Sequence, residues 1–110
     1  MLQETPRILT VPDCFAASSE ELHNRFLELY DDAYIIIDVT GVDTLDPALR
    51  AELAQLRLHR RTNGLLLGRL IVTSQNVRNA LSAVGFERHW PIFRTVDEAA
   101  ASFDGPDMYA

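Results

Sequence analysis

The side chains best suited to chemistry in this chain are three histidines and one cysteine, and their spacing does not build a reactive site. His23, His59 and His89 lie far apart, without a partner at a metal-ligand spacing such as HExxH, and a single cysteine cannot complete a zinc site. Cys14 has no adjacent base to make it a nucleophile. The glycines are too scattered for a phosphate-binding loop. We therefore expect no enzyme activity, no metal and no cofactor, and we interpret the histidines as surface or packing residues.

The stretch from residue 33 to residue 56 is where we expect function instead. Residues 34–39 form a short apolar run rich in β-branched side chains, which predicts a strand buried on both faces. Asp46 followed by Pro47 predicts the start of a helix, because the carboxylate accepts free backbone N–H groups and proline suits the first helical position. The loop between them should lie at the carboxyl edge of a sheet, where α/β proteins tend to bind ligands and partners.

The rest of the chain supplies the elements that position this loop. Short apolar runs predict strands at 8–11, 34–39, 70–73 and 92–94. Helical periodicity and capping residues predict helices from Ser18 to near Asp31, from Pro47 to Asn63, from Ser74 to Gly85 and from Thr95 to Phe103. Prolines on both sides place the first strand toward an edge of the sheet. The leucines at 65–67 extend the third strand, lengthen the loop before it, or form an exposed patch. Strands alternating with helices predict a largely parallel sheet covered by helices.

Length and charge limit the kind of protein. The 110 residues fit one domain, which we place at 1–110 with a core at 7–103 and a flexible tail at 104–110. The net charge of −6 repels phosphate backbones, so we expect no nucleic-acid partner. We interpret the one basic cluster as the solvated end of a helix: Arg57, His59, Arg60 and Arg61. A lone cysteine, no signal-peptide pattern and no apolar run of about 18 residues predict a cytoplasmic protein without membrane insertion.

Several segments occur in the order and spacing of a known family. They are IIIDVTGV, then DTLD, then an amphipathic helix, and then GRLIVTSQNVRNALSAVGFERHWPIFRTVDEAAASF. Together they resemble the STAS domain family, the anti-sigma factor antagonists and their relatives, over residues 34–103. The resemblance implies a non-catalytic, cytoplasmic bacterial module of signal transduction and transcription regulation that works by protein–protein interaction. It also implies an α/β fold with a mixed, largely parallel sheet of four to five strands and four helices.

The resemblance fails at the residue by which antagonist members are switched. In those members the loop after the central strand reads Asp-Ser-Ser-Gly, and an anti-sigma factor kinase phosphorylates a serine there to end binding. Here Asp46 holds the aspartate position, but Pro47 and Ala48 fill the serine positions and Leu49 replaces the glycine. Neither proline nor alanine has a hydroxyl, so phosphorylation at the usual position is ruled out. Thr44 is the nearest hydroxyl and the candidate for a displaced phosphorylation site.

Three functions follow from the resemblance. The first is a divergent anti-sigma factor antagonist that binds a protein partner, such as an anti-sigma factor kinase, through this loop and the helix after it. The second is a soluble subunit of a lipid-transport ABC transporter that sits on the ATPase, and the third is a small-molecule sensor. The expected partner-binding residues of the first are Thr44, Asp46, Pro47, Ala48, Arg50 and Glu52. The family's first strand is missing or very short here, which leaves a sheet edge for a possible homodimer.

Overall fold

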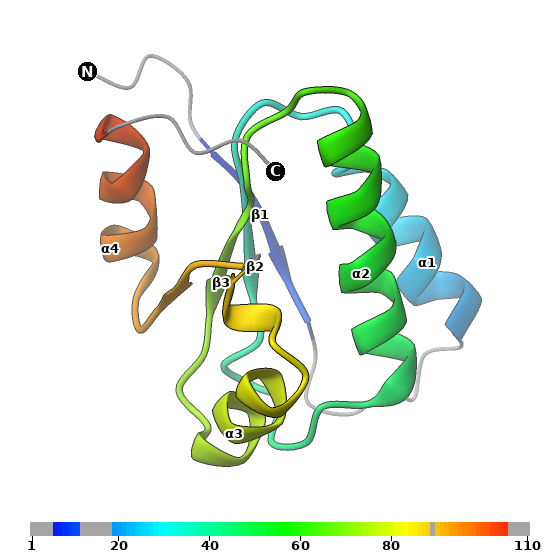
Figure 1. Ribbon diagram of the computed structural model, residues 1–110, viewed down its shortest axis with the longest axis vertical. Coiled ribbons are helices and arrows are strands. Elements are labelled where there is room, and N and C mark those ends of the chain that lie inside the picture. The colour runs from blue at the N-terminus through cyan, green and yellow to red at the C-terminus, as the bar shows by residue number, and fades with distance from the viewer. Residues whose placement is uncertain (1–5, 12–18, 89, 106–110) are drawn as a thin grey trace.

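The computed structural model describes residues 6–11, 19–88 and 90–105, and these form a parallel sheet with helices on both faces (Figure 1). The features predicted at Ser18, Cys14 and His89 lie outside the described residues. The described strands are β1 (Arg7–Thr10), β2 (Ile35–Asp38), β3 (Arg69–Ile71) and β4 (Ile92–Phe93). The described helices are α1 (Ser19–Leu27), α2 (Pro47–Thr62), α3 (Gln75–Ala83) and α4 (Val96–Ala101), with 3-10 turns at Phe86–Arg88 and Ser102–Asp104.

The sheet has the strand order β1-β2-β3-β4, and every pairing between these strands is parallel. The parallel α/β arrangement and the edge position of the first strand were predicted and are confirmed. The antiparallel component implied by a mixed sheet is absent from the described residues, where no fifth strand occurs either. Because each strand lies beside its predecessor, right-handed crossovers carry the first three helices to the same face.

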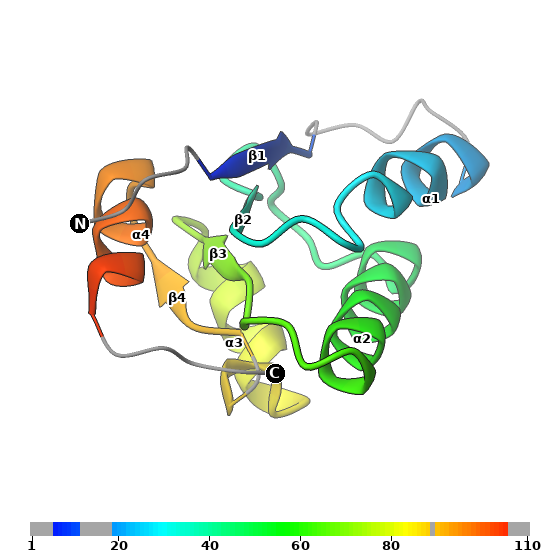
Figure 2. The same cartoon turned by 90° about the horizontal axis from the view of Figure 1, so that it is seen from above.

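The core has two parts, one on each face of the sheet. Figure 1 shows α1 and α2 on one side of the strands and α4 on the other, and Figure 2 shows the same separation from above. Successive residues of β2 alternate between the two parts: Ile35 and Ile37 pack with α1, α2 and α3, whereas Ile36 packs with Ala99 and Phe103. The predicted stripe of α2 is fully buried, and it consists of Leu49, Leu53 and Leu56. Among the described residues, no helix has the length and apolarity to cross a membrane.

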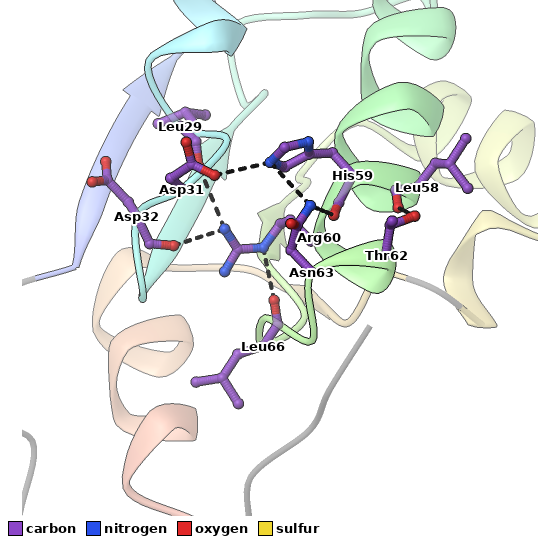
Figure 3. Close-up of polar contacts among 9 residues, drawn as sticks. All are labelled: Leu29, Asp31, Asp32, Leu58, His59, Arg60, Thr62, Asn63 and Leu66. Carbon is purple, nitrogen blue, oxygen red and sulfur yellow. Dashed lines mark hydrogen bonds and ion pairs between the residues drawn. The ribbon is translucent and has the colours of Figure 1, made fainter.

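The last turn of α2 differs from the prediction, as Figure 3 shows. Arg60 is 1% exposed and not solvated. Its Nε donates to the carbonyl of Leu66 at 2.7 Å, and its Nη1 and Nη2 donate to the carbonyls of Asp32 at 2.7 Å and Ala33 at 3.0 Å. The expectation of a solvated basic cluster was therefore wrong at Arg60. Arg60 is buried because it follows Leu53 by seven residues, which is close to two helical turns, and so continues the buried stripe of α2.

The turn before β2 is the other partner of this arginine. Helix α1 ends at Leu27, earlier than predicted, and hydrogen bonds within 26–32 continue as turns, including Asp32 N–H to the Leu29 carbonyl at 3.3 Å. Arg60 Nη1 also lies 3.4 Å from that carbonyl. Burial lowers the pKa of Arg60, and the charges of Asp32 and Asp31 oppose the shift. One guanidinium thus joins the α1–β2 turn to the loop that follows α2.

That loop, residues 65–67, is half-buried and ends before β3, so it lengthens the connection. Gly68 follows it at a close approach: a Cβ on this residue would lie 2.5 Å from Cζ3 of Trp90 and 2.9 Å from Cδ1 of Ile35. Arg69 is also 1% exposed, which the sequence did not suggest. Its guanidinium carbon lies 4.2 Å from the ring centre of Phe103, and its Nε donates to Ser102 Oγ at 2.7 Å.

Candidate functional site at the β2–α2 loop

The loop begins with a local turn at the carboxyl end of β2. Asp38 Oδ1 accepts hydrogen bonds from the backbone N–H of Thr40 at 2.9 Å and from its hydroxyl at 2.7 Å. Val39 and Val42, on either side of this turn, are 2% and 3% exposed, and the N–H of Val42 donates to the carbonyl of Val39 at 3.0 Å. The first half of the loop is therefore held by the buried side chains of Val39 and Val42.

The middle of the loop is joined to the start of α3. Ser74 is the N-cap of α3 and accepts from the N–H of Val77 at 3.3 Å, while its Oγ donates to Asp43 Oδ1 at 3.0 Å. The side chain of Leu45 packs against the same core as Val42. This Asp43–Ser74 link was not predicted, because the two residues are 31 positions apart and each looks like an ordinary loop or cap residue in the sequence.

The loop ends at the predicted helix cap, which is confirmed. Asp46 Oδ1 accepts the N–H of Ala48 at 2.8 Å, and its carbonyl accepts the N–H of Arg50 at 2.9 Å. Pro47 occupies the first position of α2. The cap draws Asp46 toward the helix end and leaves it half-buried. The resulting first turn of α2 lies at the carboxyl edge of the sheet, beside the start of α3.

The six expected partner-binding residues divide by exposure. Thr44, Pro47 and Arg50 are exposed, and Asp46 and Ala48 are half-buried. Glu52 does not project into solvent as expected, since its side chain is only 13% exposed. The exposed part of the site is thus the loop tip and the outer side of the first turn of α2.

Glu52 instead contacts α1. His23 Nδ1 lies 2.6 Å from Glu52 Oε1 and 3.0 Å from Oε2, so this histidine joins the two helices, consistent with a packing role. At the other end of the same helix pair, His59 Nε2 lies 2.9 Å from Asp31 Oδ1, and its ring centre lies 4.7 Å from that of Tyr30. Burial raises the pKa of Tyr30, and the charge of Glu52 raises it further. These contacts belong to the seam between α1 and α2, away from the exposed loop tip.

The side chains at the loop define the chemistry that it can offer. Among the described residues, no group of three or more His, Cys, Asp or Glu side chains is arranged to hold a metal ion. The exposed side chains of the loop tip offer a hydroxyl, a proline ring and a guanidinium, and a guanidinium can pair with a carboxylate.

One of the comparisons with known proteins gave a match, and it agrees with the fold. No curated protein and no solved structure gave a match. The family model of the STAS domain matches residues 2–99, which is nearly the whole chain and includes every strand described above. The parallel α/β sheet with its helices, together with this match, shows that the chain belongs to the STAS domain family.

Proposed function

We propose that this chain is a non-catalytic binding module, a divergent relative of the anti-sigma factor antagonists, which docks on a protein partner through the loop tip and the first turn of α2. The observation that carries the proposal is the fixed loop with outward side chains. Asp38 and Asp46 accept backbone N–H groups of the loop and of the helix start, and Asp43 accepts the hydroxyl of Ser74 at the start of α3. Thr44, Pro47 and Arg50 remain exposed. A surface ordered before binding loses less conformational entropy when the partner arrives.

The capped turn also bears on regulation. The N–H of Ala48 is occupied by the Asp46 carboxylate, and neither Pro47 nor Ala48 carries a hydroxyl. A phosphate would add about −1.5 to −2 charge beside that carboxylate, and this is the change that ends binding in serine-containing relatives. The proposed module binds without this control, so its occupancy follows the amounts of module and partner. Thr44, which is exposed, stays the candidate for any displaced phosphorylation.

The test measures the affinity of this chain for a purified anti-sigma factor kinase by isothermal titration calorimetry. The kinase is the one whose gene lies nearest to the gene of this chain. We expect Arg50→Glu to weaken binding about tenfold or more, because it places a carboxylate where a cation is proposed to meet the partner. Arg94→Glu is the matched control, since Arg94 is also exposed but lies on the turn between β4 and α4. Equal affinities of Arg50→Glu and wild type would remove Arg50 from the docking face, and no binding by wild type would contradict the antagonist role.

A second measurement separates binding from switching. Incubated with the kinase and ATP, wild type should carry no phosphate, whereas Ala48→Ser should be phosphorylated if the docking geometry is retained. Stoichiometric phosphate on Thr44 of wild type would show a displaced site. Binding to a transporter ATPase, or ligand-dependent thermal stabilisation, would favour the transporter-subunit or sensor function instead.

A further inference from the structure

The charges of the helical layer are segregated between its two neighbouring helices. Residues 19–32, which contain α1 and the turn after it, carry five carboxylates and one arginine. Helix α2 carries four arginines and one carboxylate, Glu52, which is held in the seam by His23. In a chain of net charge −6 without lysine, this concentration of arginine on one helix is not a general property of the surface.

Three of the arginines of α2 lie on one line along the helix. Arg50, Arg57 and Arg61 are spaced by seven and four residues, which places them on the same face over about 16 Å. We call these three residues the arginine stripe. His59, which contacts the turn after α1 through Asp31, is nine residues from Arg50. Nine residues make two and a half helical turns, so His59 lies on the opposite side of α2 from Arg50. The stripe therefore lies on the side of α2 that is turned away from α1.

The arginine stripe has no internal neutralising partner in the part of the chain that the structure describes. No hydrogen bond or ion pair occurs there for its three guanidinium groups, and Nε of Arg57 is buried without a hydrogen-bond acceptor. Leu58, next to the stripe, is 60% exposed. Arg50 and Arg61 are exposed and Arg57 is half-buried. Two exposed cations near an exposed leucine form a surface suited to an acidic, partly apolar partner.

Helix α1 presents a surface of that chemistry. Glu20 is exposed, and the side chains of Glu28 and Asp31 are 63% and 87% exposed. Leu27, between Glu20 and Glu28 in the sequence, is 46% exposed. We call Glu20, Leu27, Glu28 and Asp31 the acidic face. Glu28 contacts Arg7 of β1 and Asp31 contacts His59 of α2, so the acidic face extends over the end of α1 from the β1 side to the α2 side. The ion pair of Glu28 with Arg7 is exposed on both sides and contributes little, so it does not prevent new contacts.

We infer that the arginine stripe of one molecule binds the acidic face of a second copy of this chain. The carboxylates oppose the three arginines, and Leu58 of one copy meets Leu27 of the other. The two surfaces differ, so the contact is heterologous and leaves a free stripe and a free acidic face at the ends of every dimer. A third copy can therefore add in the same way. The inference shares Arg50 with the docking proposal but does not rest on it, because Arg57, Leu58 and Arg61 lie outside the loop and first turn.

The test is sedimentation equilibrium of the full chain at pH 8 in 0.1 M and 1 M NaCl. At 0.1 M NaCl the Debye length is about 10 Å, whereas the molecule is 37 Å long. The repulsion between the net charges of two molecules is therefore largely screened, but opposite charges in direct contact still attract. At 1 M NaCl the Debye length is about 3 Å. We expect the average mass to rise with protein concentration in 0.1 M NaCl and to stay at the monomer mass in 1 M NaCl.

Matched variants locate the contact. Arg61→Glu should weaken self-association about tenfold, and Arg94→Glu, with the same change in net charge, should leave it within about twofold. Leu58→Ala should weaken it without changing charge, and Arg50→Glu repeats the charge test if Arg61→Glu unfolds. Mixing Arg61→Glu with Asp31→Arg should restore association that each lacks alone.

Three outcomes would overturn the inference. They are a monomer at all concentrations in 0.1 M NaCl, association that persists in 1 M NaCl, and equal effects of Arg61→Glu and Arg94→Glu. Loss of kinase binding in Arg50→Glu but not in Arg61→Glu would separate the two proposals.

Discussion

Replacing Arg60 by methionine tests whether one buried guanidinium holds the two turns at the amino edge of the sheet. Methionine keeps an unbranched apolar chain of similar width but has no donor. The carbonyls of Asp32, Ala33 and Leu66 lose donors at 2.7, 3.0 and 2.7 Å, and each bond to a charged group stabilises by about 1.5–3 kcal/mol. The three together amount to about 4.5–9 kcal/mol.

Part of that stabilisation is offset by the cost of burying the charge, which also lowers the pKa of Arg60. We therefore expect a net loss of about 3 kcal/mol in the free energy of unfolding. Urea unfolding followed by fluorescence measures it, because Trp90 is the one tryptophan of the chain and is 1% exposed.

The next residue provides a matched control. Arg61 is exposed, so Arg61→Met should change the free energy of unfolding by less than about 0.5 kcal/mol. Arg60→Lys should fall between wild type and Arg60→Met, since one ammonium cannot reproduce the fork of a guanidinium. If Arg60→Met unfolds within about 1 kcal/mol of wild type, with an unchanged dependence on urea, the guanidinium does not hold the turns.

Three further predictions concern single sites. Gly68→Ala should lower the free energy of unfolding by about 1–3 kcal/mol and shift the emission of Trp90, because the new Cβ meets the indole; unchanged emission and stability would contradict the close approach. The pKa of Tyr30 is raised by burial from its ordinary value of 10.0, so folding opposes ionisation and stability should fall as the pH rises above about 10. Tyr30→Phe should reduce that fall, as urea unfolding at pH 8 and pH 11 would show. Asp46→Ala should cost about 1 kcal/mol through loss of the cap to Ala48 N–H, and amide exchange at the start of α2 should speed up; Asp46→Asn, which can still accept, should lose less.

Most of the fold was predictable because its elements are locally consistent. The caps at Asp46, Ser74 and Thr95 each accept the N–H that the sequence pattern indicates. Gly85 has φ +75°, as a glycine that ends a helix requires. These features depend on residues within a few positions of one another, so an apolar period and a capping side chain suffice to locate them.

The contacts that the sequence did not reveal join distant segments. Arg60 and Arg69 are buried although arginine is a surface residue by type. Backbone carbonyls 27 and 28 residues away contact Arg60, and an aromatic ring 34 residues away contacts Arg69. Glu52 was expected on the outer side of α2 but pairs with His23, 29 residues earlier. Periodicity states which side of a helix is polar, but it does not state which polar residue meets a neighbouring helix.

The brevity of β4 limits how folded molecules can join through their backbones. Only Ile92 and Phe93 belong to this border strand, and the preceding Pro91 has no N–H to offer. An incoming chain would gain too few ladder bonds there to compensate for being ordered. At this border the native protein is thus protected from the strand-by-strand polymerisation that threatens proteins with long open borders.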